Sequence, residues 1–140
     1  MDATHLGLLC DYYELTMANG YFQAGFGEKI SYFDMFFREV PDRGGFAIAA
    51  GLEQLVYYIQ HLRFDDEDIA FLQGKGIFSQ DFLDYLKDFR FTGDIWAVPE
   101  GTVVFPNEPI VTVRAPALQA QLIETYLLLT INHQSLVATK

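Results

Sequence analysis

The residues best suited to chemistry are concentrated in residues 8–22, which read LLCDYYELTMANGYF. This run is apolar enough to belong to a core, yet it contains a thiol, two carboxyl groups and three tyrosines. Cys10, the only cysteine, could act as a nucleophile, although a lone thiol is more often a small buried residue. Asp11 and Glu14 match the capping box of a helix over residues 11–23, since a glutamate follows the capping position by three residues. The run is therefore a candidate catalytic centre or a capped helix.

Polar groups elsewhere form no recognised catalytic motif. The histidines His5, His61 and His133 lack the spacing of metal ligands, and no Gly-rich phosphate loop, HExxH, CxxC or GxSxG occurs. The acidic run from Asp65 to Asp68 could suggest a metal cluster, but four consecutive acids cannot all face one ion. It is better interpreted as a helix start at the positive end of the helix dipole. The motifs alone thus predict an α+β domain without an assigned reaction.

Composition limits the class of protein. With 140 residues the chain is the size of one domain, 1–140, and can bury a sizeable core. Its net charge of −10 argues against nucleic-acid binding, and a phosphate-rich ligand would need a few well-placed cations or help from another chain. Aromatic residues make up 16% of the chain, more large rings than one small core requires, which predicts a partner surface.

The same features predict a cytoplasmic location. A single cysteine excludes an internal disulfide, which is typical of a reducing compartment. The first residues, MDATH, place no basic region ahead of the apolar run and so do not resemble a signal peptide. The longest apolar segments carry charges or amides, so no membrane span is predicted.

Periodicity and punctuation predict the elements. The first half favours helices over 11–23, 46–62 and 79–89, the last capped by Ser79, a strand over 30–40, a turn over 41–45, and a helix that begins within 65–68. The second half favours short strands over 91–98, 102–105 and 110–114, followed by one long helix that Pro116 opens. One face of that helix would carry Leu118, Leu122, Thr125, Leu129, Asn132 and Leu136. The helix lacks a stop signal before Lys140, so we expect a piece of a longer chain.

Several stretches resemble, in order, the N-terminal part of nicotinate phosphoribosyltransferases. They are 8–17 (LLCDYYELTM), 33–38 (FDMFFR), 46–52 (FAIAAGL), 99–109, 121–125 and 131–140, and they span essentially the whole chain. Cys10 and Tyr12 depart from the family, which commonly has a hydroxyl residue and an aliphatic residue at these positions.

The resemblance implies an α+β fold, a hammerhead-like N-terminal domain with helices plus a small β-sandwich or half-barrel, truncated before the phosphoribosyltransferase barrel. The family transfers a phosphoribosyl group from phosphoribosyl pyrophosphate (PRPP) to nicotinate, with ATP hydrolysis favouring nicotinate mononucleotide in NAD biosynthesis. The histidine that is phosphorylated lies in the barrel, beyond Lys140. No catalytic residue is therefore expected in this chain, and the chain alone is expected to be inactive.

The resemblance also implies binding roles. Tyr13 matches the tyrosine that stacks on the pyridine ring, and otherwise would be a core tyrosine. Arg38 matches the arginine that reaches phosphate or pyrophosphate, and otherwise would be a surface charge at a strand end. Asp11 either helps to hold PRPP or serves only as a helix N-cap. Asn132 and His133 are expected to make hydrogen bonds between elements rather than to bind ligands.

Mg²⁺ and ATP serve the full-length family, and neither these nor another metal is expected on this chain alone. Family members are implied to be homodimers in which the N-terminal domain of one subunit completes the active site of the other. Two alternatives stay open. One is a non-catalytic assembly or interaction module, suggested by the acidic charge and surplus rings. The other is a related enzyme for nicotinamide, whereas quinolinate would need more basic residues than this chain has.

Overall fold

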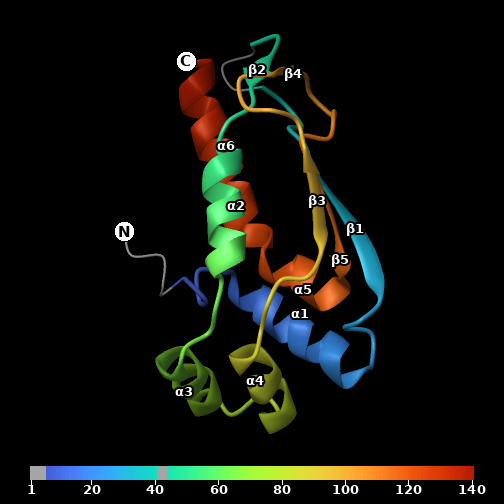
Figure 1. Ribbon diagram of the computed structural model, residues 1–140, viewed down its shortest axis with the longest axis vertical. Coiled ribbons are helices and arrows are strands. Elements are labelled where there is room, and N and C mark those ends of the chain that lie inside the picture. The colour runs from blue at the N-terminus through green and yellow to red at the C-terminus, as the bar shows by residue number, and fades with distance from the viewer. Residues whose placement is uncertain (1–5, 41–43) are drawn as a thin grey trace.

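The computed structural model describes residues 6–40 and 44–140, so His5 and part of the predicted turn over 41–45 lie outside the described residues. Helices and strands are interspersed along the chain, as Figure 1 shows. The helices are α1 (Tyr12–Gln23), α2 (Leu52–His61), α3 (Asp66–Gly74), α4 (Gln80–Lys87), α5 (Ala117–Leu122) and α6 (Glu124–Thr139). The strands are β1 (Ile30–Met35), β2 (Ala47–Ile48), β3 (Asp94–Ala97), β4 (Val103–Val104) and β5 (Val111–Pro116). The predicted α+β class is confirmed.

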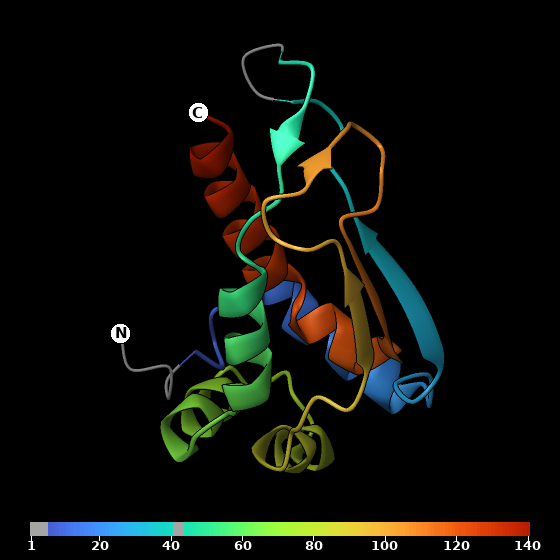
Figure 2. The ribbon, with the colours of Figure 1, turned by 45° about the horizontal axis from the view of Figure 1, so that its top comes forward.

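The strands form two antiparallel ladders. In the larger sheet β5 lies between β1 and β3, with Phe33 and Ile95 both opposite Val113. Val111, Val113 and Ala115 are buried toward the helices, whereas Tyr32 and Trp96 remain exposed on the other face, as the alternation of strand side chains requires. The short β2–β4 ladder lies at the far end of the molecule, beside the end of α6 (Figure 2). The larger sheet thus has one covered and one open face.

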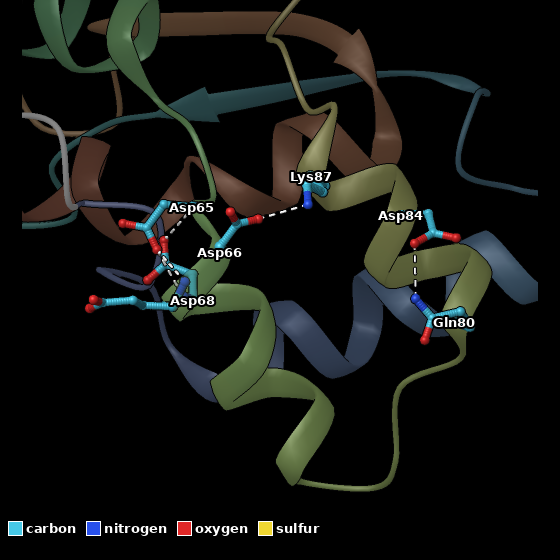
Figure 3. A network of polar contacts seen from close by, with 7 residues as sticks. Asp65, Asp66, Asp68, Gln80, Asp84 and Lys87 are labelled. Atoms are coloured by element: carbon cyan, nitrogen blue, oxygen red, sulfur yellow. Dashed lines mark hydrogen bonds and ion pairs between the residues drawn. The ribbon is translucent and has the colours of Figure 1, made fainter.

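The starts of α3 and α4 confirm the predicted caps. Asp65 accepts from the backbone of Glu67 and Asp68 at 2.9 Å, and Asp68 returns a bond to the Asp65 amide. Lys87 of α4 forms an ion pair with Asp66 at 2.7 Å (Figure 3). The acidic run therefore caps α3 and also contacts α4. Within the described part of the chain no group of acids, histidines and cysteines could hold a metal ion.

The prediction of one helix over 46–62 is wrong. Residues Ala47–Ile48 pair with β4, and the helix begins only at Leu52. Gly51 precedes it with φ of 103°, a conformation that favours glycine, and a Cβ there would lie 3.0 Å from the carbonyl oxygen of Thr130. Gly51 therefore lets the chain turn from strand to helix while it passes close to α6.

The prediction of one long helix after Pro116 is also wrong, because the helix is interrupted at Ile123. At this junction the amide of Thr125 donates to a carboxylate oxygen of Glu14, from α1. The interruption changes which side of the helix faces the core. Leu129 and Asn132 of the predicted face are exposed, and the buried residues of α6 are Tyr126, Leu127, Thr130, Ile131 and Ser135.

The predicted strand over 30–40 is shorter than expected. β1 ends at Met35, after which the chain pairs with the loop that precedes β5. The Asn107 amide donates to the Phe37 carbonyl at 2.7 Å, and the Ile110 amide to the Met35 carbonyl at 2.8 Å. No helix in the described ranges is long and apolar enough to cross a membrane.

Candidate functional site

The start of α1 is bound to the junction between α5 and α6 through a buried carboxylate. Glu14 is 0% exposed. Its Oε1 accepts from the Thr125 amide at 2.9 Å and from the Thr125 hydroxyl at 2.7 Å. The same hydroxyl oxygen accepts from the Asp11 amide at 3.0 Å. One threonine thus connects two residues of the first turn of α1 to α6.

The predicted capping box between Asp11 and Glu14 is wrong in its contacts, although α1 does begin after Asp11. The Asp11 side chain makes no capping hydrogen bond, and Glu14 points into the core instead of back toward the Asp11 amide. Thr125 replaces Glu14 as the acceptor for that amide. The Asp11 carboxylate is exposed and makes no capping hydrogen bond to α1, whose Glu14 amide donates to the Asp11 backbone carbonyl instead.

Tyr13 lies beside this contact and is fixed at its hydroxyl. Its Oη donates to Oε1 of Glu124 at 3.0 Å, and Oε2 of Glu124 accepts from the Gln121 amide nitrogen at 2.7 Å. Burial of part of the side chain, and then the bond to Glu124, raise the pKa of Tyr13 to about 12, so the hydroxyl remains a donor at neutral pH. Since 46% of the residue is exposed, Tyr13 is no core residue and its ring is accessible.

Burial also changes the acidity of Glu14. Desolvation raises its pKa to about 7, the bond from the Thr125 hydroxyl opposes the shift, and the charges of Glu124 and Asp11 add to it. Its second oxygen, Oε2, is buried without a hydrogen-bond partner in the described structure. The nearby buried hydroxyl of Tyr58 is likewise unpartnered there. Glu14 is thus a buried acid that titrates near neutral pH.

An apolar pocket of about 100 Å³ opens between the sheet and the two C-terminal helices. Glu124 lines it from the helix side and Asp34 from β1. Apolar cavities that enclose a benzene ring measure about 150 Å³, so this pocket is too small to enclose a whole aromatic ring. The remaining lining residues are Phe33, Met35, Val113, Ala120, Ile123, Leu127 and Leu128.

Arg38 follows β1 on a different segment from the residues of the Tyr13 contact. Arg38 is exposed, three residues beyond Met35, which lines the small pocket. Among described residues it forms no ion pair. It belongs to the segment that leaves the sheet and not to the α5–α6 junction.

The structure also shows the surroundings of the other polar residues that the sequence analysis considered. Cys10 is partly buried, and burial, followed by the charge of Glu14, raises its pKa to about 12, which disfavours the thiolate that a nucleophile needs. His61 stacks on Tyr57 within α2. Asn132 and His133 are exposed on α6 and make no hydrogen bond to other described residues, so their role as links between elements stays a prediction.

Sequence reasoning missed the residues that position Tyr13. Thr125 and Glu124 had no motif of their own, and Glu14 was assigned to a local cap. The one available signal was the matching stretch over 121–125, which contains Gln121 and both of these junction residues.

The family model for the nicotinate phosphoribosyltransferase (NAPRTase) N-terminal domain matches residues 8–132. The chain belongs to this family. It is 46% identical over 140 residues to a nicotinate phosphoribosyltransferase of Mycobacterium tuberculosis, covering 97% of this chain and 29% of the relative. It is 44% identical over 135 residues to the Bacillus subtilis (strain 168) nicotinate phosphoribosyltransferase, covering 96% of this chain and 28% of the relative. The chain therefore spans less than a third of these relatives.

Solved structures agree with the NAPRTase assignment. The crystal structure of human nicotinic acid phosphoribosyltransferase is similar with a TM-score of 0.88 and 38% identity, covering 94% of this chain and 27% of that chain. A nicotinate-nucleotide pyrophosphorylase from Pyrococcus furiosus has a TM-score of 0.65 at 17% identity, covering 93% of this chain and 26% of that chain, which is a likeness of fold. The resemblance found in the sequence is confirmed.

Proposed function

We propose that this chain supplies the pyridine-binding wall of a nicotinate phosphoribosyltransferase. The reaction transfers the phosphoribosyl group of PRPP to the ring nitrogen of nicotinate, with ATP hydrolysis, in NAD biosynthesis. The observation that carries the proposal is the state of Tyr13, whose ring is exposed while its hydroxyl is held by Glu124. Membership of the NAPRTase family supports the reaction.

The three predicted site residues receive distinct roles. Tyr13 stacks on the pyridine ring, and the bond to Glu124 fixes the position of the far end of its ring, which favours a productive approach of the acceptor nitrogen. Arg38 binds phosphate or pyrophosphate oxygens through its guanidinium, which forms no ion pair with a described residue. The Asp11 carboxylate makes no capping hydrogen bond within the described structure, so it can accept hydrogen bonds from PRPP hydroxyls.

The proposal extends to the domain, its assembly and the shared binding site. Residues 1–140 act as one N-terminal domain of a cytoplasmic homodimer, where nicotinate and PRPP bind between this domain and a phosphoribosyltransferase barrel. The small pocket, too limited for a whole aromatic ring, supports a site completed by other residues. The described residues offer no cluster suited to Mg²⁺, so no step assigned to this chain passes through a metal.

A chimaera tests the proposal. This chain replaces the matching 28% of the Bacillus subtilis relative, and turnover is measured with PRPP, ATP, Mg²⁺ and either nicotinate or nicotinamide. We expect activity with nicotinate, none from this chain alone, and a loss of activity for Tyr13→Ala. Exposed Tyr32→Ala, on the open face of the sheet, is the matched control.

Three results would contradict parts of the proposal. Clear turnover by this chain alone would contradict its role as one wall of a composite site. Faster turnover of nicotinamide than of nicotinate would show that nicotinamide, and not nicotinate, is the substrate. An assembly module would be favoured by two results together: a chimaera that folds but is inactive, and a stable dimer of this chain that does not respond to ligands.

A further inference from the structure

A second, larger pocket of about 330 Å³ lies between the end of α2 and the segment that joins α4 to β3. Small-molecule sites measure about 300–1,000 Å³, so this pocket is of ligand size. Its polar lining is Gln60, Arg63 and Arg90, and its apolar lining includes Val56, Phe91 and Ile95. Among the described residues, no carboxylate lines it.

Both arginines are anchored without being neutralised. Nη1 of Arg63 donates to the Leu62 carbonyl, and Nη1 of Arg90 donates to the Phe89 carbonyl. Each guanidinium has five N–H donors, so most remain available. Neither forms an ion pair with a described residue, whereas Arg114 pairs with Asp94 at 2.9 Å.

The two charges also act on each other. Burial, and then the positive charge of Arg90, lower the pKa of Arg63, which places the guanidinium groups within electrostatic reach of one another. Two like charges at one pocket repel, and an anion between them would remove that repulsion. The gathering of two of the nine basic residues at one pocket stands out in a chain of net charge −10.

Arg90 has acidic neighbours on its other side. It also borders a hollow that Glu28, Asp81, Asp84 and Asp88 line, yet none of these carboxylates lies within ion-pair distance of it. These acids repel an anion from that hollow. An anionic ligand that binds Arg90 is therefore directed to the side shared with Arg63.

We propose that this pocket binds a phosphate group carried on an apolar body. Arg63 and Arg90 contact the phosphate oxygens, since guanidinium forks match phosphate geometry. Gln60 adds an amide donor, and Phe91 and Ile95 contact the apolar body. The site is independent of the proposed transferase reaction, because it uses neither Tyr13 nor Arg38.

Binding to the protein is measured by calorimetry with phenyl phosphate and inorganic phosphate, without nicotinate or PRPP. We expect phenyl phosphate to bind more tightly, and Arg63→Met and Arg90→Met each to weaken it by about tenfold or more, as the loss of a charged hydrogen-bonded contact predicts. Arg114→Met is the matched control, because its side chain is on the other face of the sheet from Ile95. It should leave the affinity unchanged.

Amide NMR shifts in the unaltered protein locate the ligand without relying on any variant. Residues 60–63 and 90–95 should shift together during the titration. Shifts elsewhere, or no binding at millimolar phenyl phosphate, would overturn the site. Equal affinity for the two ligands would overturn the role given to Phe91 and Ile95. Failure of the chimaeric enzyme would leave these binding results unaffected.

Discussion

The hydroxyl of Tyr13 donates to Oε1 of Glu124 at 3.0 Å, across a sequence separation of 111 residues. The bond joins the first turn of α1 to the first residue of α6. The ring of Tyr13 remains accessible because only its hydroxyl end is engaged. Glu14 and Thr125 make a second connection between the same two elements, so the position of the ring depends on both.

The Tyr13 hydroxyl can be tested separately from its ring. Tyr13→Phe keeps a stacking surface but loses the bond to Glu124, so we expect the KM for nicotinate in the chimaera to rise by about two- to tenfold, equivalent to one net hydrogen bond. The value of kcat should change less. Tyr32→Phe is the control for a conservative change at an exposed tyrosine. An unchanged KM would show that the bond to Glu124 does not orient the ring.

Glu14 should make stability depend on pH. Its folded-state pKa of about 7 exceeds the ordinary value of 4.5, so the folded form holds the proton more tightly. The stabilisation is complete below pH 4.5 and is lost as the pH rises through 7, a change on the order of 3 kcal/mol. Glu14→Gln cannot titrate and should remove this dependence from urea unfolding curves. Exposed Glu67→Gln should retain it, and identical pH profiles for the two variants would contradict the assignment.

Thr125 should matter through its hydroxyl. Thr125→Val removes the donor to Glu14 and the acceptor for the Asp11 amide while keeping the shape of the side chain. We expect a loss of about 1–3 kcal/mol in the free energy of unfolding, because a buried carboxylate loses a partner. Thr125→Ser keeps the hydroxyl and should lose clearly less. Equal losses in the two variants would assign the effect to packing of the methyl group.

Two stacked tyrosines offer a matched pair. The rings of Tyr58 and Tyr126 are 3.7 Å apart between centroids, but only the hydroxyl of Tyr126 has a partner in the described structure, Gln54 at 3.1 Å. Tyr58→Phe removes an unsatisfied buried hydroxyl and should leave stability unchanged or raise it by about 1 kcal/mol. Tyr126→Phe should lower stability by about the same amount. Thermal unfolding of both proteins measures the difference, and a large loss in Tyr58→Phe would reveal a bonded hydroxyl.

Local signals in the sequence predicted local structure well. The helix starts at Asp65 and Ser79 were confirmed because a cap depends on residues within three positions of each other. The α+β class and the family were confirmed because they depend on many motifs in order. The roles of Asp11, Tyr13 and Arg38 stay predictions, and the Tyr13 variants above test one of them.

Contacts between distant segments decided the rest. The interruption at Ile123 and the inward turn of Glu14 arise where two helices meet, so neither is visible in the periodicity of either segment. The turn from strand to helix needs a glycine at position 51, because a Cβ there would lie too close to the backbone of α6. The sequence by itself determined the family, and it predicted Tyr13 as the residue that contacts a pyridine ring. Only the tertiary structure decided which side chains position Tyr13. A buried carboxylate such as Glu14 forms its hydrogen bonds with the donors that the fold brings next to it.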